Sequence, residues 1–222
     1  QRVFESIAAF SERLGHPQWL VERWVAAYGR EAALKICEAG QKEPAGVAWF
    51  TENGGDLPQM DEGSRLVEEL AAAVMPAAKR GWDCCAAPGG KTLILARRLA
   101  VAEIAATDIS ARRLAQTEAR FRRYAYAERV RCAVADAATA ADADGERFDL
   151  ILCDVPCSGT GTLAANPEIR HRLKPEEFTR QAARQRAILM AALRRLALGG
   201  RLVYSTCSLE PAECEQVVEG VL

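Results

Sequence analysis

Two cysteines stand in segments whose composition suits chemistry better than packing. Cys157 lies in DVPCSGTG (residues 154–161) and Cys207 lies in YSTCSLEP (residues 204–211). Each thiol follows an apolar, strand-like run and has small polar neighbours. A thiolate is an effective covalent nucleophile when nearby groups lower its pKa. We therefore interpret both residues as candidate reactive thiols. A disulfide between them and a pair of inert core thiols are the alternatives.

An acid or a thiol ends four of the strand-like runs of this chain. AEIAATDI contains Asp108, RVRCAVAD ends at Asp136, RFDLILCD ends at Asp154, and RLVYSTC ends at Cys207. The carboxyl ends of parallel strands lie along one edge of a sheet. We therefore expect these four groups to share one crevice, and we expect Cys157 there as well if the last two strands are neighbours.

The elements that must position these residues alternate along the chain. Five strand-like runs alternate with helical patterns at 66–75, 91–100, 110–126, 175–198 and from 210 onward. This order predicts an α/β fold with a doubly wound, mostly parallel sheet. Residues 1–60 differ: Trp19, Leu20, Trp24 and Ala27 form one apolar helical stripe, and 41–59 are linker-like. We expect an N-terminal helical segment and linker (1–60) and a catalytic domain (61–222).

The turn CAAPGGKT (residues 85–92) follows the first of these strands and precedes a helix. Glycines let a backbone approach a ligand, and a helix N-terminus offers unpaired N–H groups. The segment is neither a P-loop nor a G-x-G-x-x-G fingerprint. Asp108 follows it at the spacing of a ribose-binding acid, and Asp136 is placed to meet a base edge. These residues predict a nucleoside-bearing cofactor, with NAD and a purely structural turn as the alternatives.

Composition restricts the class of protein. The chain has 222 residues, a net charge of −1, eight cysteines and two histidines. No apolar run approaches the ~20 residues of a membrane span, and no signal peptide is visible, so we expect a reduced cytoplasmic location and no membrane partner. Without a paired C-x-x-C, we expect no metal. Arginines cluster at 112–131 and 180–195, where they either bind phosphates or cover solvated helix faces.

A nucleophilic thiol, a nucleoside cofactor and an acid together favour one reaction. C5 of a pyrimidine is a poor nucleophile, but addition of a thiolate at C6 makes C5 enamine-like and able to attack an electrophilic methyl group. An acid at N3 would assist the addition. A base must then remove the C5 proton so that the enzyme is released.

Three blocks of this sequence resemble the signature segments of the RsmB/Nop2/Sun family of RNA 5-methylcytosine methyltransferases. They are DCCAAPGGKT, DVPCSGTG and YSTCSLEPAECE, and the resemblance covers residues 61–222. HPQWLVERW is similar to the helical segment of bacterial rRNA members. The resemblance implies a Rossmann-like fold, S-adenosylmethionine as methyl donor and a cytosine in RNA as acceptor. We expect rRNA as the substrate, with tRNA as the runner-up, and we expect the protein to be a monomer.

The resemblance also implies a role for each candidate site residue. Cys207 would attack C6, Cys157 would assist product release, and Asp154 would bond to the base between cofactor and cytosine. Asp108 would hold the ribose hydroxyls and Asp136 the adenine side, with Arg113 as a weaker cofactor-side candidate. The cofactor's methionine portion would be cradled by Cys85, Ala86, Ala87, Pro88, Gly89, Gly90 and Lys91.

Three departures from the family pattern accompany this resemblance. Ala48–Gln59 is too short for the small RNA-binding subdomain that usually precedes the catalytic domain. The chain ends at Leu222 without the two further strands that the family's sheet usually has, so we expect a truncated domain; because it also begins without Met, we expect a fragment. Cys214 stands where the family usually has Asn. Two other functions stay open: a non-catalytic RNA-binding or assembly factor, and a nicotinamide-dependent oxidoreductase.

Overall fold

The computed structural model describes residues 5–42, 51–52, 55–56, 60–99, 102–139 and 145–222. The chain forms two compact units. The helical unit comprises residues 1–45, 157–182 and 207–219, and the sheet unit comprises residues 46–156, 183–206 and 220–222. The predicted domain boundary at residue 60 stays a prediction.

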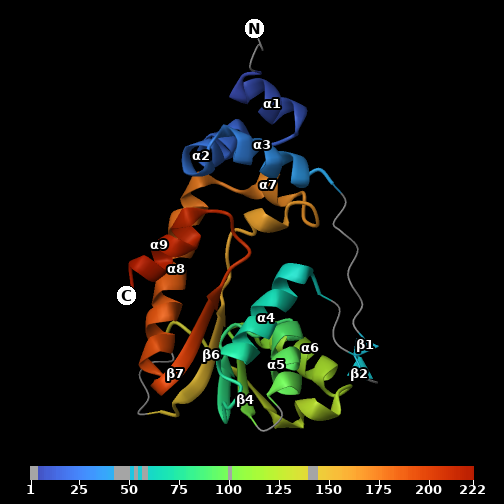
Figure 1. The fold of residues 1–222 in the computed structure, drawn as a ribbon, viewed down its shortest axis with the longest axis vertical. Coiled ribbons are helices and arrows are strands. Elements are labelled where there is room, and N and C mark those ends of the chain that lie inside the picture. Colours follow the sequence, from blue (N-terminus) through green and yellow to red (C-terminus); the bar gives the residue numbers. More distant parts are fainter. Residues whose placement is uncertain (1–4, 43–50, 53–54, 57–59, 100–101, 140–144) are drawn as a thin grey trace. The chain divides into compact units, whose positions relative to one another are not determined.

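The sheet unit contains five parallel strands (Figure 1) in the order β5-β4-β3-β6-β7. This order confirms the predicted doubly wound α/β fold, and it makes the last two strands neighbours. In their paired register Asp154 lies opposite Ser205. The strands are β3 (Arg80–Asp83), β4 (Glu103–Asp108), β5 (Val130–Val134), β6 (Phe148–Asp154) and β7 (Leu196–Ser205).

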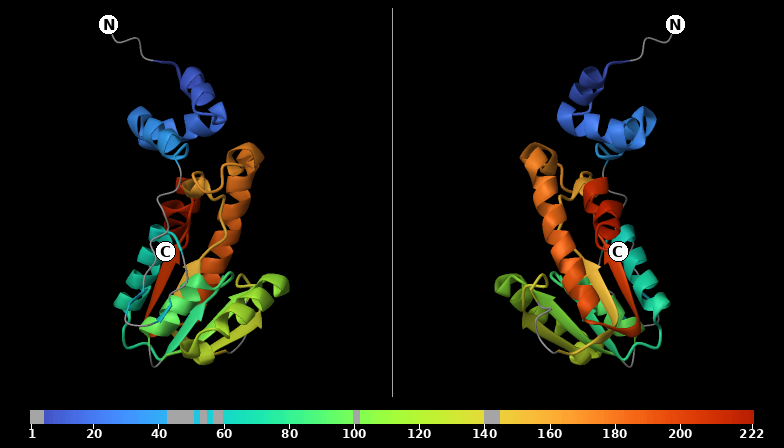
Figure 2. Two further views of the ribbon diagram at one scale, coloured as in Figure 1. Left: turned by 90° about the vertical axis from the view of Figure 1, so that its right-hand side faces the viewer. Right: turned by 90° about the vertical axis from the view of Figure 1, so that its left-hand side faces the viewer.

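Helices cover both faces of this sheet because β6 is apolar on both sides. Leu150 and Leu152 pack in one core cluster with side chains of α4 (Glu62–Val74) and α5 (Gly90–Arg98). Ile151 and Cys153 pack in a second cluster with Ile188 and Ala192 of α8 (Pro175–Arg194). Successive strand side chains point to opposite faces, so the two layers follow from the sequence of β6. Figure 2 shows α4 and α8 on opposite sides of the strands.

The predicted end of the long helix is wrong. We expected it to run to residue 198 and to stop at Gly199-Gly200, but α8 ends at Arg194 and both glycines lie inside β7. The register between β6 and β7 shifts here. Gly199 has a φ of +78°, and a Cβ on Gly200 would lie 2.9 Å from the Asp149 carbonyl oxygen. The two glycines therefore form a bulge in a strand rather than a helix stop.

Three other predicted ends also shift. The helix α6 (Ala111–Phe121) stops before residue 126 and is followed by a 3-10 turn, η1 (Ala125–Arg129). Strands β5 and β7 end two residues before Asp136 and Cys207, respectively, so these two side chains lie on the loops beyond their strands.

The helical unit is built on an aromatic core. Phe10, Leu20, Val21, Trp24 and Phe178 are buried together there. The predicted stripe is confirmed for Leu20 and Trp24, and Trp19 is partly buried; Ala27 is exposed, so its prediction is wrong, and Val21 is buried instead. The elements are α1 (Ile7–Arg13), α2 (Gln18–Tyr28), α3 (Arg30–Ala39), η3 (Thr160–Thr162), α7 (Ile169–Arg172), the start of α8, η4 (Pro211–Glu213) and α9 (Glu215–Glu219).

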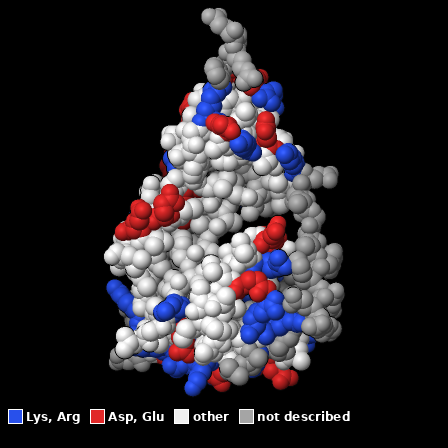
Figure 3. Space-filling model, viewed as in Figure 1, with Lys and Arg blue, Asp and Glu red and all other residues white. Residues whose placement is uncertain are grey.

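The predicted linker contains a short pair of strands. A short antiparallel pair, β1 (Thr51–Glu52) and β2 (Gly55–Asp56), lies within the predicted linker, most of which is outside the described residues. No helix among the described residues is long and apolar enough to cross a bilayer. The face seen in Figure 3 carries interspersed basic and acidic side chains, consistent with the net charge of −1.

Candidate active site

The two candidate thiols meet in the helical unit. The Sγ atoms of Cys157 and Cys207 lie 3.1 Å apart, a contact in which either thiol can donate a hydrogen bond. Both cysteines are unoxidised; Cys207 is exposed and Cys157 is half-buried. The expectation that the two thiols share one place is confirmed.

Backbone contacts hold the two cysteine loops together. The amide of Gly161 donates a 2.8 Å hydrogen bond to the Cys207 carbonyl oxygen, and the amide of Leu209 donates one of 2.8 Å to Thr160 Oγ1. A Cβ at residue 161 would lie 2.8 Å from that same Cys207 oxygen. Only glycine allows this approach, which explains the second glycine of DVPCSGTG.

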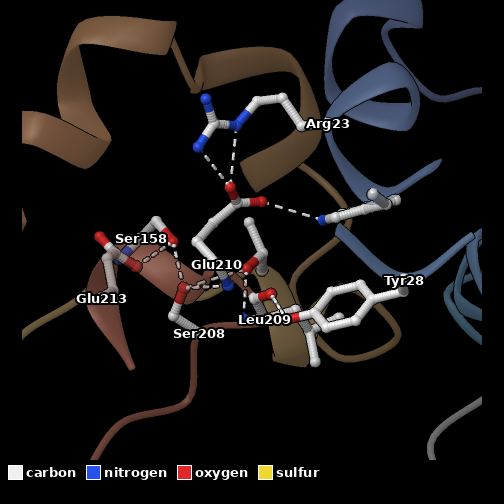
Figure 4. A network of polar contacts seen from close by, with 9 residues as sticks. Arg23, Tyr28, Ser158, Ser208, Leu209, Glu210 and Glu213 are labelled. Atoms are coloured by element: carbon white, nitrogen blue, oxygen red, sulfur yellow. Dashed lines mark hydrogen bonds and ion pairs between the residues drawn. The ribbon is translucent and has the colours of Figure 1, made fainter. Parts of the chain in front are cut away.

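A buried polar network (Figure 4) includes the serine that follows each of the two cysteines in the sequence. Glu213 is fully buried and accepts hydrogen bonds from the backbone amide and the hydroxyl of Ser158, the latter at 2.6 Å. The Ser158 hydroxyl also lies 3.1 Å from the Ser208 hydroxyl. Because Ser158 follows Cys157 and Ser208 follows Cys207, the network fixes the backbone next to each sulfur.

A second buried carboxylate connects helix α2 to the Cys207 loop. Glu210 is 1% exposed and accepts a 2.8 Å hydrogen bond from Arg23 Nε and a 2.9 Å hydrogen bond from Trp24 Nε1. The Tyr28 hydroxyl donates to the Leu209 carbonyl oxygen. A buried charge is tolerated when it is paired and hydrogen-bonded, as Glu210 is.

A cavity of about 260 Å³ lies in the sheet unit at the predicted glycine turn. Seven predicted site residues line it: Cys85, Ala86, Ala87, Pro88, Gly90, Lys91 and Asp154. Gly89, Asp108, Arg113 and Asp136 are not among its lining residues. Sequence reasoning missed five others: Met60, Asp61, Ser64, Asp83 and Arg120.

Asp83, the last residue of β3, is the most unusual group in this cavity. It is 1% exposed; its Oδ2 accepts a 2.7 Å hydrogen bond from Thr92, whereas its Oδ1 has no partner among the described residues. Burial raises the pKa of Asp83 to about 7, although the Thr92 hydrogen bond opposes the rise. A buried acceptor without a partner costs free energy, so this oxygen is suited to a cationic ligand group.

Lys91 and Asp154 form an ion pair at the same cavity. Lys91 Nζ lies 3.0 Å from Asp154 Oδ2 and donates to Ser64 Oγ, while Asp154 Oδ1 accepts a 2.7 Å hydrogen bond from Ser205. Burial lowers the pKa of Lys91, but the charge and hydrogen bond of Asp154, together with the nearby acids Glu68 and Asp83, outweigh it, and the pKa lies above its ordinary value. Asp154 therefore faces the glycine turn, as expected.

Glu68 of α4 is a second buried acid near this ion pair. Its side chain is fully buried, and neither of its carboxyl oxygens has a hydrogen-bond partner among the described residues. Burial raises the pKa of Glu68 to about 9 even though Lys91 opposes the rise. The carboxyl group is therefore neutral at pH 7.

The remaining cofactor-side residues brace the glycine turn. Asp108 accepts hydrogen bonds from the amides of Ala87 (3.2 Å) and Ser110 (2.9 Å), and it lies 3.5 Å from Arg113 Nη1. Gly89 has a φ of +89°, and a Cβ there would lie 2.5 Å from Thr117 Cγ2, so the turn requires glycine.

Two further predicted residues complete this set. Asp136 Oδ1 accepts a 3.0 Å hydrogen bond from the Ala138 amide. The contact between the Sγ atoms of Cys84 and Cys85, together with burial, raises the pKa of Cys85, which therefore stays a thiol. Among the described residues, no group of three or more His, Cys, Asp or Glu side chains could hold a metal ion.

Comparison with known proteins places this site in a family. A model of the 16S rRNA methyltransferase RsmB/F family matches residues 74–222, which is most of the chain and includes both thiols and nine of the twelve residues that line the cavity at the glycine turn. The chain belongs to this family. The resemblance of its three blocks to RsmB/Nop2/Sun proteins is thereby confirmed.

Curated relatives agree with this assignment. The chain is 39% identical over 169 residues to ribosomal RNA small subunit methyltransferase B of Xanthomonas campestris, covering 76% of this chain and 38% of that protein. It is 27% identical over 265 residues to the probable ribosomal RNA small subunit methyltransferase B of Bacillus subtilis, covering 98% and 58%. The chain thus spans about half the length of the curated relatives that it matches: 38% of the first and 58% of the second.

Solved structures support the fold. The crystal structure of PH0851 covers 99% of this chain and 59% of that chain with a TM-score of 0.79 and 23% identity, so it bears on the fold alone. NSun6 from Pyrococcus horikoshii, solved with SFG, is 33% identical, with a TM-score of 0.59 over 70% of this chain and 40% of that chain.

Proposed function

We propose that this chain methylates C5 of cytosine in RNA through a covalent bond between Cys207 Sγ and C6 of the base. Ribosomal RNA is the proposed substrate, and tRNA is the runner-up. The 3.1 Å approach of Cys157 and Cys207 carries the proposal. Such a reaction needs one sulfur that bonds to the base and a neighbouring group that assists when the bond breaks. Two unoxidised thiols in contact supply both.

The methyl donor is S-adenosylmethionine, which supplies an electrophilic methyl group on a sulfonium. The residues of the sheet unit fit it. Asp83 Oδ1, buried and unpartnered among the described residues, suits the ammonium of the methionine portion, and Arg120 at the same cavity suits its carboxylate. The backbone from Cys85 to Lys91 would cradle this portion. Asp108 and Asp136 stay our proposed residues for the ribose hydroxyls and the adenine side, with Arg113 secondary.

The two thiols would divide the work. Addition of the Cys207 thiolate to C6 forms the Sγ–C6 bond and moves an electron pair toward C5. After methylation, a base removes the C5 proton, the electron pair re-forms the C5–C6 double bond, and the sulfur leaves as thiolate. The exposure of Cys207 supports its role as the attacking group, because it must reach a base. Cys157, half-buried beside it, would assist the release.

Asp154 would bond to the ring of the cytosine. Its carboxylate is oriented by Lys91 and Ser205, which is the kind of support that a positioned acid needs. Chain connectivity supports its participation. Val155 and Pro156 alone separate Asp154 from Cys157, and Thr206 alone separates Ser205 from Cys207. Because Asp154 and Ser205 are paired in register, the two cysteine segments leave the sheet from adjacent points.

Methyl transfer from labelled S-adenosylmethionine to a small-subunit rRNA transcript tests the proposal. We expect label in RNA from the wild type and from Cys132→Ala, whose thiol lies on β5 outside the site, and none from Cys207→Ala. Bisulfite sequencing should find the product as 5-methylcytosine. A tRNA substrate arm distinguishes the runner-up substrate. Label on another atom of the base, or full activity in Cys207→Ala, would overturn the proposal.

The alternative of a non-catalytic RNA-binding or assembly factor makes a different prediction. Such a protein would bind RNA and show no heat of binding with S-adenosylmethionine in calorimetry. The thiol pair and the Asp83 oxygen that has no hydrogen-bond partner among the described residues count against it, since binding RNA requires neither.

We also propose that the protein is a monomer and that it is located in the cytoplasm.

A further inference from the structure

A second cavity, of about 360 Å³, opens beside Cys157 in the helical unit. Its walls come from the Cys157 segment, from α7 and the turn that follows it, and from the first turns of α8. Sequence reasoning did not identify it. A cavity of this size lies within the usual range for a small-molecule or nucleotide site.

The charge of this cavity is positive. Arg172, Lys174 and Arg180 line it together with one acid, Glu177. Arg180 forms an ion pair with Glu177, so that acid is already neutralised. The side chains of Arg172 and Lys174 are exposed and make no hydrogen bond or ion pair with any residue that the structure describes. Two cations without an acidic partner thus stand beside a candidate catalytic thiol.

The position of these two cations in the same cavity as Cys157 indicates which ligand they would bind. A cytosine held at the thiols belongs to a polynucleotide, so phosphates must follow the base on either side. Arg presents a fork that matches phosphate oxygens, and Lys presents a point charge. Ile169 and Leu173 add apolar wall to the same cavity, where a ribose or a neighbouring base could pack.

We infer that this cavity binds the sugar–phosphate backbone of RNA next to the target cytosine, with Arg172 and Lys174 on a phosphate. The inference rests on the proposed function and specifies its substrate contact. Among the residues that line this cavity, Cys157 alone is a predicted site residue.

The salt dependence of RNA binding tests this contact. Each phosphate neutralised by a Lys or Arg contributes about 0.7–0.9 to the slope of log K against log salt concentration. In filter binding of a small-subunit rRNA transcript, we expect Arg172→Ala/Lys174→Ala to lower the slope by about 0.7–0.9, the contribution of one phosphate, and to weaken binding on the order of tenfold at 150 mM salt. Arg172→Lys keeps the charge and should keep most of the slope.

Three controls make the result interpretable. Lys35→Ala removes an exposed lysine of the same unit that pairs with Glu31, and it should leave the slope unchanged. Calorimetry with S-adenosylmethionine should give wild-type affinity for the double variant. In methyl-transfer assays, KM for RNA should rise on the order of tenfold with kcat within about twofold.

The possible failures are distinguishable. A double variant with the wild-type salt slope overturns the inference, whether or not the wild type is active. A slope that falls equally in Lys35→Ala also overturns it, because the effect would then be one of general charge. A wild type that transfers no methyl group to RNA refutes the proposed function instead, while the slope still decides this contact.

Discussion

The Sγ atoms of Cys157 and Cys207 lie 3.1 Å apart, although 49 residues separate them in the sequence. Two loops leave the neighbouring strands β6 and β7, and Gly161 lets their backbones meet at the Cys207 carbonyl oxygen. Two buried carboxylates, Glu210 and Glu213, accept hydrogen bonds that hold the two loops in place. The site is therefore a rigidly supported pair of thiols.

The first prediction concerns oxidation of this pair. Brief treatment with hydrogen peroxide should join Cys157 and Cys207 in a disulfide, because the sulfurs need to close only to about 2.05 Å. Two thiols lose two electrons and two protons, and the peroxide is reduced to water. Peptide mapping should find this cross-link, methyl transfer should be lost, and dithiothreitol should restore it. Cross-linking of other cysteines in preference to this pair would contradict the geometry.

The second prediction concerns Glu213 as a positioning residue. Glu213→Gln removes the charge that accepts from the Ser158 amide and hydroxyl, so the Cys157 backbone should loosen. We expect turnover to fall about tenfold, the equivalent of 1–2 kcal/mol, with covalent RNA adduct accumulating because release is slowed. Glu219→Gln, on the exposed end of α9, is the matched control. An equal loss of adduct formation and turnover would indicate a general structural defect instead.

The third prediction concerns the pH dependence of cofactor affinity. Asp83 must ionise to hold a cationic group, and burial raises its pKa to about 7 in the free protein. Binding below that pH therefore has to displace a proton, so affinity for S-adenosylmethionine should rise from pH 5.5 to about 7 by up to tenfold per unit and then level off. Calorimetry of Asp83→Asn should give weaker binding with a nearly flat profile. A wild-type profile in that variant would remove Asp83 from the site.

The fourth prediction concerns the cost of burying Glu68. The folded pKa of about 9 lies above the unfolded value, so the unfolded state binds fewer protons and stability is lost as pH rises from about 4.5 to 9. Glu68→Gln should flatten this dependence and raise the free energy of unfolding at pH 8, on the order of 2 kcal/mol. Urea unfolding at pH 6 and pH 8 measures it. Glu62→Gln, exposed on the same helix, should not change the pH dependence.

Part of this site was predictable because strand ends follow a rule. Asp154, Cys157 and Cys207 were predicted as site residues because parallel strands present their carboxyl ends at one edge. The same rule applies to Asp83, which ends β3, so its signal was present and was missed. Glu68 also left a signal: it lies three and four residues before Ala71 and Ala72, on the buried face of α4.

Other features had no local signal. Trp24 and Glu210 are 186 residues apart, and their hydrogen bond depends on how the helical unit folds. Gly199-Gly200 reads as a helix stop, but the same two residues also suit a strand bulge, and only pairing with β6 decides between them. Arg172 and Lys174 look like ordinary surface charges in the sequence; the cavity beside Cys157 is what distinguishes them.

The most direct measurement is the covalent RNA adduct formed by the two cysteine variants. With a small-subunit rRNA transcript and S-adenosylmethionine, Cys157→Ala should accumulate an adduct that survives denaturing electrophoresis and carries a methylated cytosine, because attack proceeds and release fails. Cys207→Ala and the double variant should form none. An adduct in Cys207→Ala, or its absence in Cys157→Ala despite lost turnover, would contradict the division of labour between the two sulfurs.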